Sequence, residues 1–231
     1  MKLLIVLASL CVLAACERAD DETPAAQAST ARQTCEQFPQ SDDDGTPTRP
    51  DVPLELTAFV EASTTTITIE RESGSPACID VAYGEVDVWH QFVGGRLIGV
   101  GITGHEFNSY LVVDRNSAAE PVETGVKPVF SPSGRRFASV DVSESGFGAF
   151  EALGVWEVTD TSIRNLVTRE DLLDRGYDWQ LVHWAADDCL VFSTAADPTG
   201  VDLEERKFHE LRLTERPALE DVAEAAACRP A

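Results

Sequence analysis

Positive charge is scarce in this chain of 231 residues. Lys and Arg together number 18 against 40 Asp and Glu residues, so the formal net charge is −22 at pH 7. A surface of that sign repels phosphate backbones and anionic lipid headgroups, which argues against a nucleic acid as partner. The excess of acidic residues is typical of a soluble surface, and it is also compatible with a basic protein partner or with Ca²⁺ ions.

No hydrophobic run is long enough to stay in a membrane as a helix. The apolar stretch at the N-terminus runs from Leu3 to Leu13, whereas about 20 helical residues are needed to cross roughly 30 Å of hydrocarbon. Lys2 precedes this stretch and small residues follow it, as in a secretory signal. We therefore expect residues 1–15 to be a signal peptide that is removed on export, which changes the net charge from −22 to −23 because Lys2 leaves with it.

The signal ends in Leu13-Ala14-Ala15-Cys16. This segment resembles the lipobox of bacterial lipoproteins. The resemblance implies cleavage before Cys16 and attachment of palmitate-like chains to that cysteine, first as a thioether-linked diacylglycerol. One chain binds a membrane only reversibly, since each buried methylene contributes roughly 0.8 kcal/mol, but two or three chains anchor a protein stably.

The lipobox resemblance also implies a location. A lipoprotein of this kind faces the periplasm and is held at a membrane by its lipid. Glu17 follows the lipidated position, where an Asp favours retention in the inner membrane of enterobacteria. The outer membrane is therefore favoured over the inner one.

Cysteine spacing of the zinc-binding kind is absent. There is no C-x-x-C and no close Cys/His cluster, so we expect no metal site. Cys11 would leave with the signal peptide and Cys16 would carry lipid, which leaves Cys35, Cys78, Cys189 and Cys228. An even number of cysteines in an oxidising compartment predicts two disulfides. Three pairings are open, and we favour Cys35–Cys78 with Cys189–Cys228, which ties each end of the domain to its nearer neighbour.

Helical periodicity is also sparse. The segment Thr66-Ile67-Thr68-Ile69-Glu70 alternates as a half-buried strand should. Similar runs, separated by Gly, Pro, Asp or Ser at roughly 8–15 residues, indicate an antiparallel sandwich, barrel or propeller-like domain. The predicted strands cover 54–60, 66–70, 78–83, 85–91, 96–102, 110–114, 136–142, 154–159, 179–184, 190–194 and 208–213.

This pattern sets the predicted domain organisation. Residues 16–53 hold the lipidated Cys16, a polar Ala-rich stretch and several prolines, so we interpret them as a flexible tether. Residues 54–231 then form a single, mostly β domain. Its one clear helix signal is Pro217–Ala227, where Leu219 and Val222 share a face, so we expect a short C-terminal helix.

The segment Phe130-Ser-Pro-Ser-Gly-Arg-Arg-Phe-Ala138 resembles the hairpin of Tol-associated β-propeller blades, with Ser133 in place of the Asp of their Pro-Asp-Gly turn. A faint internal repeat surrounds it. Residues 110–140 and residues 154–194 both show a strand, a connection, an aromatic residue, a turn and a strand. A blade-like hairpin within another β fold and a complete propeller both remain open.

Complete catalytic motifs are missing. The chain has no G-x-S-x-G, and neither His105-Glu106 nor His209-Glu210 is followed by the second histidine of a zinc protease. Residues 99–104 have G-x-G-x-x-G spacing, but a strand-like sequence follows, so we interpret them as a glycine-rich strand. We assign no catalytic residue, metal or cofactor, although a Ser/His/Asp triad assembled from distant loops stays open.

Aromatic residues supply the remaining candidates for a site. The loop 143–150 spaces Ser143, Phe147 and Phe150 with glycines, and loops on a rigid β scaffold commonly bind ligands. The four tryptophans fit either a core or the floor of a groove. We therefore expect a non-enzymatic envelope lipoprotein that binds a protein or a small envelope ligand. The alternatives are an extracytoplasmic hydrolase with a scattered site and an inhibitor of a basic, lysozyme-like enzyme.

Overall fold

The computed structural model describes residues 34–39, 48–72, 74–104, 107–141, 152–169, 177–195, 206–214 and 218–222. The chain divides into two units, Met1–Arg32 and Gln33–Ala231, and all the described residues belong to the second. No helix in this described part is long and apolar enough to cross a membrane.

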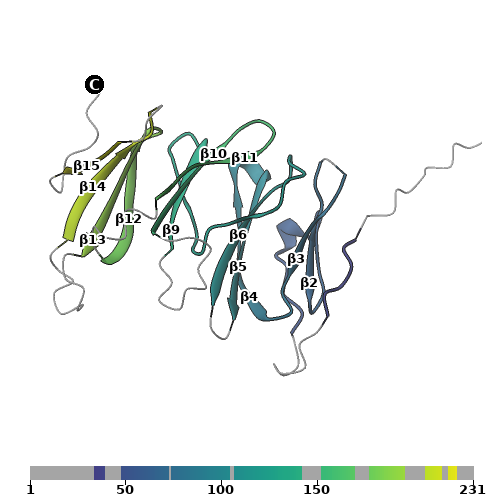
Figure 1. Ribbon diagram of the computed structural model, residues 1–231. Helices are drawn as coiled ribbons and strands as arrows, with labels where there is room; N and C mark the ends of the chain where they lie inside the picture. The colour runs from purple at the N-terminus through teal and green to yellow at the C-terminus, as the bar shows by residue number, and fades with distance from the viewer. Residues whose placement is uncertain are drawn as a thin grey trace, which may run out of the picture. The chain divides into compact units, whose positions relative to one another are not determined.

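The described chain is mostly β, as predicted, and forms four antiparallel sheets (Figure 1). In each sheet the strands are neighbours in the order of the sequence. The first sheet holds β1 (Val60–Ala62), β2 (Thr66–Ile69) and β3 (Ala77–Asp80), and the second holds β4 (Gly84–Phe92), β5 (Leu97–Gly104), β6 (Asn108–Asp114) and β7 (Val122–Glu123). The third sheet holds β8 (Val129–Phe130), β9 (Arg136–Asp141), β10 (Ala152–Val158) and β11 (Ile163–Arg169), and the fourth holds β12 (Tyr177–Ala186), β13 (Cys189–Ala195), β14 (Arg206–Arg212) and β15 (Ala218–Val222).

The sheets pack face to face in chain order. Strand β5 shows this most clearly, because successive side chains point to opposite faces. Ile98 and Val100 pack with the first sheet, while Leu97 joins a cluster with Phe137 and Trp156 of the third sheet. A further apolar cluster joins the third and fourth sheets. Antiparallel sheets packed face to face in this way are consistent with an all-β sandwich.

The two halves of the internal repeat occupy equivalent places. Residues 110–114 are in β6, the third strand of the second sheet, and lead to the β8–β9 hairpin of the third sheet. Residues 154–158 are in β10, the third strand of the third sheet, and lead to the β12–β13 hairpin of the fourth. The faint repeat in the sequence therefore corresponds to one structural unit used twice.

The hairpin turns of the two copies contact each other. In the first, the Gly134 N–H donates to the Ser131 carbonyl at 2.9 Å, and Gly134 has φ +70°, which glycine adopts without strain. The Ser133 N–H donates to Asp187 Oδ1 in the second turn at 3.0 Å, and Arg136 Nη1 donates to the Asp187 carbonyl at 2.8 Å. The bond from Ser133 holds the pKa of Asp187 below its ordinary value. The turns thus join the third and fourth sheets.

The G-x-G-x-x-G segment lies inside β5, so its interpretation as a glycine-rich strand is confirmed. A side chain at Gly99 would overlap the Tyr110 ring. Because Gly99 has no side chain, the Tyr110 side chain on β6 can pass over β5 to reach β4. There its Oη lies 2.9 Å from His90 Nδ1. Burial raises the pKa of the Tyr110 hydroxyl. Two of the three glycines thus leave room for aromatic rings, Gly99 for Tyr110 and Gly104 for Phe107.

Two predictions about helix and strand are wrong. The expected C-terminal helix is the strand β15, which pairs antiparallel with β14 and places Leu219 opposite Leu211. This pairing satisfies backbone groups that would otherwise lie at an open edge, an effect stronger than helix propensity. At the other end, the strand predicted over 54–60 begins as a 3₁₀-helix, Leu54–Leu56, in which only Leu56 is buried.

Part of the predicted tether contacts the domain. The Cys35 and Phe38 N–H groups donate to Thr68 Oγ1 and Thr66 Oγ1 at 3.3 and 3.0 Å. These two threonines lie on the face of β2 opposite its isoleucines, and all four residues of β2 are buried. Trp89 Nε1 also donates to the Asp51 carbonyl at 3.0 Å. Residues 34–39 thus cover the outer face of the first sheet.

The Cys35–Cys78 disulfide is confirmed, with a Cα–Cα distance of 5.7 Å. It joins the covering segment to β3. Cys189 is also disulfide-bonded. Its expected partner, Cys228, lies outside the described residues.

Removing the first disulfide should be costly. Its cysteines are 43 residues apart, and the loop-entropy relation gives about 3–4 kcal/mol for a closed loop of that size. We expect Cys35→Ser/Cys78→Ser to lower the free energy of unfolding by that amount in urea denaturation. Each single variant should lose nearly as much as the double variant. A double variant as stable as the wild type would show that the bond does not stabilise the domain.

Candidate functional site

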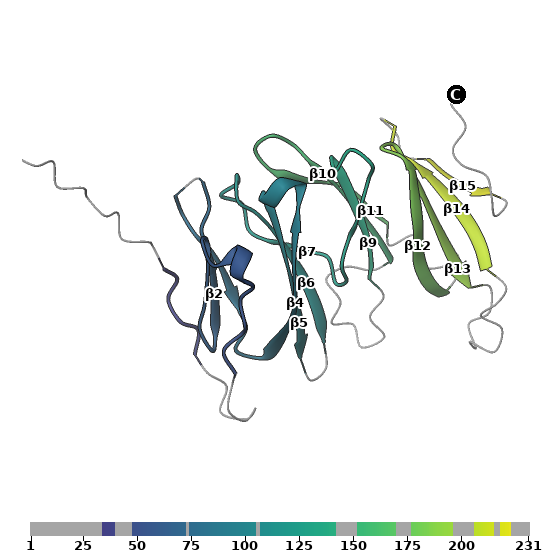
Figure 2. The same cartoon turned by 180° about the vertical axis from the view of Figure 1, so that it is seen from behind.

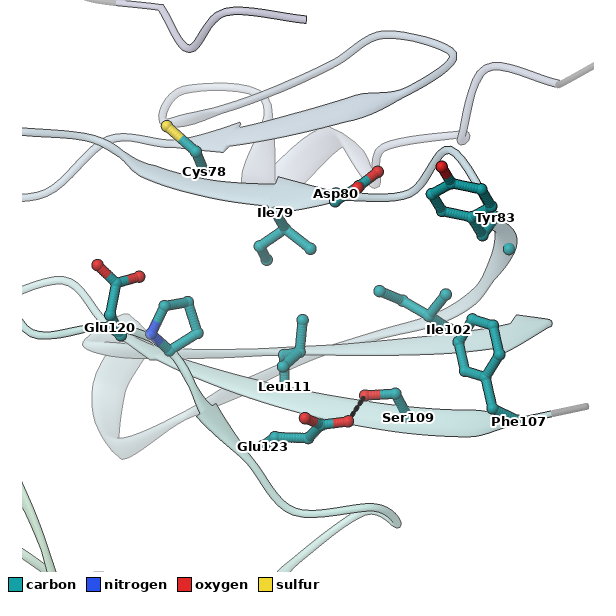
Figure 3. A pocket seen from close by; sticks show the side chains of 12 residues that line it. Cys78, Ile79, Asp80, Tyr83, Ile102, Phe107, Ser109, Leu111, Glu120 and Glu123 are labelled. Carbon is teal, nitrogen blue, oxygen red and sulfur yellow. Dashed lines mark hydrogen bonds between the residues drawn. The ribbon is translucent and has the colours of Figure 1, made fainter. Parts of the chain in front are cut away.

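A groove with a cavity volume of about 390 Å³ lies between the first and second sheets (Figure 3). Its lining comes from β3, from the β3–β4 turn, and from β5, β6 and β7 with the segments that flank them. The lining residues are Cys78, Ile79, Asp80, Tyr83, Gly84, Ile102, Phe107, Ser109, Leu111, Glu120, Pro121 and Glu123.

The groove runs along one edge of β3. Ile79 is buried toward the second sheet, whereas Cys78 and Asp80 are exposed on the other face of the strand. Side chains alternate between the two faces of a strand, so a groove on one face would meet only every second residue. The groove is lined by Cys78, Ile79 and Asp80 in succession, and it therefore follows the backbone edge of β3. No residue of β2 lines it. In the described part of the chain β3 pairs with β2 alone, so the edge beside the groove has no strand partner.

The floor of the groove is apolar. Ile79 points from β3 toward Leu111 of β6 and Ile102 of β5, and Phe107 closes one end (Figure 3). Leu111 is only half-buried and lies opposite Glu123 in the β6–β7 register. The floor is therefore the part of the second sheet that the narrower first sheet leaves uncovered. Figure 2 shows β7 beside β6 at this side of the second sheet.

Three carboxylates stand around this floor. Asp80 Oδ1 accepts the Ala82 N–H at 2.8 Å, and Glu123 Oε1 accepts the Ser109 hydroxyl at 2.7 Å. Glu120 lies at the far end, opposite Tyr83 (Figure 3). Within the described ranges, no Lys, Arg or His forms a salt bridge with any of the three. The groove thus combines an apolar floor with three carboxylates that have no salt bridge among the described residues, although the charge of Arg71 acts on Glu120.

Arginine side chains fix the two sheets that form the groove. The Arg115 guanidinium lies 4.0 Å from the centre of the Phe59 ring, and its Nε donates to the Glu70 carbonyl at 3.1 Å. Arg71 Nη2 donates to the Ala119 carbonyl at 2.7 Å. Burial lowers the pKa of Arg71, and Glu120 partly opposes that effect. These contacts cross from the first sheet to the second, so the groove is held by both.

The four tryptophans, which were candidates from the sequence, do not line this groove. Ser143, Phe147 and Phe150 lie outside the described residues. Trp156, Trp179 and Trp184 are 6–8% exposed and belong to the core. Trp89 is half-buried against the first-sheet cluster.

The described histidines likewise do not line the groove. His183 is exposed on β12, and His105 lies outside the described residues. His209 is buried, with Nε2 3.0 Å from Thr194 Oγ1. Burial and the nearby Lys127 lower the pKa of His90. Among the residues that the structure describes, no group of three His, Cys, Asp or Glu side chains could hold a metal ion.

Sequence reasoning missed the groove because its residues are scattered from position 78 to position 123. Glu120-Pro121-Val122-Glu123 was the one local signal, since paired acids around a proline suit a short, charged edge strand. Nothing in the sequence shows that this segment lies near β3.

The sequence matches no protein-family model, and no curated protein is significantly similar to it. The geometry of the groove and the predicted N-terminal signal therefore supply the grounds for a function.

Proposed function

We propose that this chain is a lipoprotein of the bacterial cell envelope, anchored by lipid on Cys16, whose β domain is a non-enzymatic binding module. The groove along β3 is its ligand site. The observation that carries the proposal is the combination found there: an apolar floor, a strand edge that no described strand pairs with, and three carboxylates that form no salt bridge with the described residues.

The size and chemistry of the groove support binding. Ligand sites have volumes of about 300–1,000 Å³ and are mostly apolar with a few placed polar groups. The groove has about 390 Å³. Tyr83 is 55% exposed at its end, and tyrosine is enriched where proteins bind other proteins. A protein segment or a small envelope ligand would meet both an apolar surface and hydrogen-bond acceptors.

The disulfides support the proposed compartment. Cys35, Cys78 and Cys189 are all disulfide-bonded, and such bonds persist in oxidising compartments such as the periplasm. The lipobox predicts export to that compartment, with the outer membrane favoured. The anchor and the disulfides are thus consistent with each other.

Replacing Cys16 tests the anchor. We expect Cys16→Ala to abolish incorporation of radiolabelled palmitate, because no thiol remains at the cleavage point to accept diacylglycerol. The variant should be released from the membrane fraction or accumulate as the uncleaved precursor. Cys11→Ala is the control, since Cys11 lies within the signal peptide, and it should be labelled like the wild type. A Cys16→Ala protein that is mature and membrane-bound would contradict the proposal.

The non-enzymatic part has its own test. The purified protein should not be labelled by serine-reactive activity probes and should not cleave peptidoglycan or glycan substrates. Stoichiometric labelling, or turnover abolished by a single substitution, would favour the hydrolase alternative.

A further inference from the structure

We propose that the groove is an unfilled fourth-strand position of the first sheet, and that it binds an extended, basic segment of a partner protein by β-strand addition. This inference rests on the proposed function of the domain as a binding module, and it names the ligand class.

The repeated architecture shows where the strand would lie. The second, third and fourth sheets each have four strands, and the last strand of each pairs with the third. The described first sheet has three, and the chain passes from β3 to β4 through Val81–Tyr83. The groove borders the free edge of β3 and lies over β6 and β7, the third and fourth strands of the next sheet. A fourth strand would cover that surface.

An added strand would find partners for its backbone and for half of its side chains. The edge of β3 presents N–H and C=O groups that can pair with an extended segment, the mode called β-augmentation. Side chains of such a segment alternate between two faces. One set would pack on Ile79 and Leu111. The other would project on the face of β3 that carries Asp80.

Charge selects a basic occupant. Asp80, Glu120 and Glu123 surround the position without salt-bridge partners among the described residues. Arg71 attracts Glu120, so Asp80 and Glu123 carry most of the argument. A second copy of this chain, with net charge −22, would be repelled. The predicted tether 17–33 also has net negative charge, with Glu17, Asp20, Asp21 and Glu22 against Arg18 and Arg32. A segment in which apolar residues alternate with Lys or Arg fits both the floor and the carboxylates.

A designed peptide tests the inference on the full-length lipidated protein in detergent. The probe is a fluorescein-labelled peptide of alternating Lys and Val, about nine residues long because a strand is commonly 3–10 residues. One control replaces every Lys with Glu. A second replaces the central Val with Pro, which removes a ladder N–H. We expect fluorescence anisotropy to show at least tenfold weaker binding of both controls, and weaker binding of the probe in high salt.

Matched variants separate the groove from the overall charge. Asp80→Asn/Glu123→Gln removes two charges at the groove, and Glu55→Gln/Glu85→Gln removes two exposed charges that do not line it. We expect the first pair to weaken binding about tenfold, one order of magnitude being about 1.4 kcal/mol, and the second pair to have less than a twofold effect. Hydrogen exchange should slow at the Cys78 and Asp80 amides when the probe binds. These two N–H groups face the open edge of β3, because the Val81 N–H donates to the Thr65 carbonyl on the β2 side and N–H direction alternates along a strand.

Several results would overturn the inference. Equal loss in both variant pairs would indicate attraction to net charge alone, and equal binding of the Pro control would exclude strand pairing. Slow exchange at the Cys78 and Asp80 amides without any peptide would show that the chain fills the position itself. Failure of the probe to bind while Cys16 is normally lipidated would overturn this inference and leave the proposed anchor intact. Failure of lipidation while the probe binds would overturn the proposed anchor and leave this inference intact.

Discussion

Replacing Phe137 with alanine should lower the free energy of unfolding by about 3–5 kcal/mol. The Phe137 side chain on β9 is fully buried and packs between the second and third sheets. Its ring centre lies 5.2 Å from that of Trp156 and 5.1 Å from that of Phe130. The substitution removes apolar contacts and leaves a cavity in a cluster that no neighbouring segment can fill.

Urea denaturation followed by tryptophan fluorescence measures this loss, because Trp156 reports on the same cluster. Val129→Ala is the control. Val129 precedes Phe130 on β8 and is 40% exposed, so it should change stability by about 0.5 kcal/mol or less. A loss below about 1 kcal/mol for Phe137→Ala, with an unchanged slope, would contradict the packing between these two sheets. A second transition would show instead that the sheets unfold as separate units.

Replacing Asp114 with alanine should have an effect of similar size for an electrostatic reason. The Asp114 side chain at the end of β6 is 4% exposed and accepts hydrogen bonds from Arg96 Nε and Nη2 at 2.8 and 2.7 Å. This bond raises the pKa of Arg96 against the effect of burial. Without Asp114, Arg96, whose side chain is only 17% exposed, loses the carboxylate that accepts its hydrogen bonds and keeps only the weaker attraction of Asp160 and Glu72. Breaking one side of such a buried pair costs about 3–5 kcal/mol.

The paired replacement supplies the control. Arg96→Met/Asp114→Leu removes both charges and keeps similar volumes, so it should be clearly more stable than Asp114→Ala. Thermal and urea denaturation of the three proteins would show the order. A double variant as unstable as Asp114→Ala would contradict the electrostatic explanation. The loss would then come from shape and from the hydrogen bond that the Asn116 N–H donates to Asp114 Oδ1 at 3.0 Å, which both variants lack.

The same substitution bears on the groove. Asp114 also lies near Arg71, whose hydrogen bond to the Ala119 carbonyl joins the first sheet to the second. Loss of Asp114 therefore affects the contacts that hold the groove as well as the stability of β6.

Local patterns predicted much of the fold. The bounds of most strands were predicted to within a few residues. The reason is that β-branched and aromatic residues recur at every second position along a strand, and this period is a property of the strand itself. The Ser131–Gly134 turn was predicted for the same reason, since proline and glycine restrict or permit backbone angles wherever they occur. Strand β11, at Ile163–Arg169, was missed because its alternation is interrupted by polar residues and its pairing with β10 compensates.

The end of the chain shows where local reasoning fails. Ala218–Val222 has helix-forming residues, yet it is a strand because β14 offers a backbone partner. The covering segment at Cys35 is a similar case, since the threonines of β2 bind its backbone. Both outcomes depend on neighbours far along the chain.

By itself, the sequence determined the mostly β class and the even set of cysteines, and it predicts the export signal and the lipobox at Cys16. Each of these is read from adjacent residues or from composition. Only the tertiary structure decided that the described first sheet is one strand narrower than the second, and that Ile79, Leu111 and three carboxylates meet beside it. The physical reason is that the groove lies where the first sheet has no strand to cover the second. The number of strands in a sheet depends on contacts between distant segments, so it leaves no periodic pattern in the residues beside the groove.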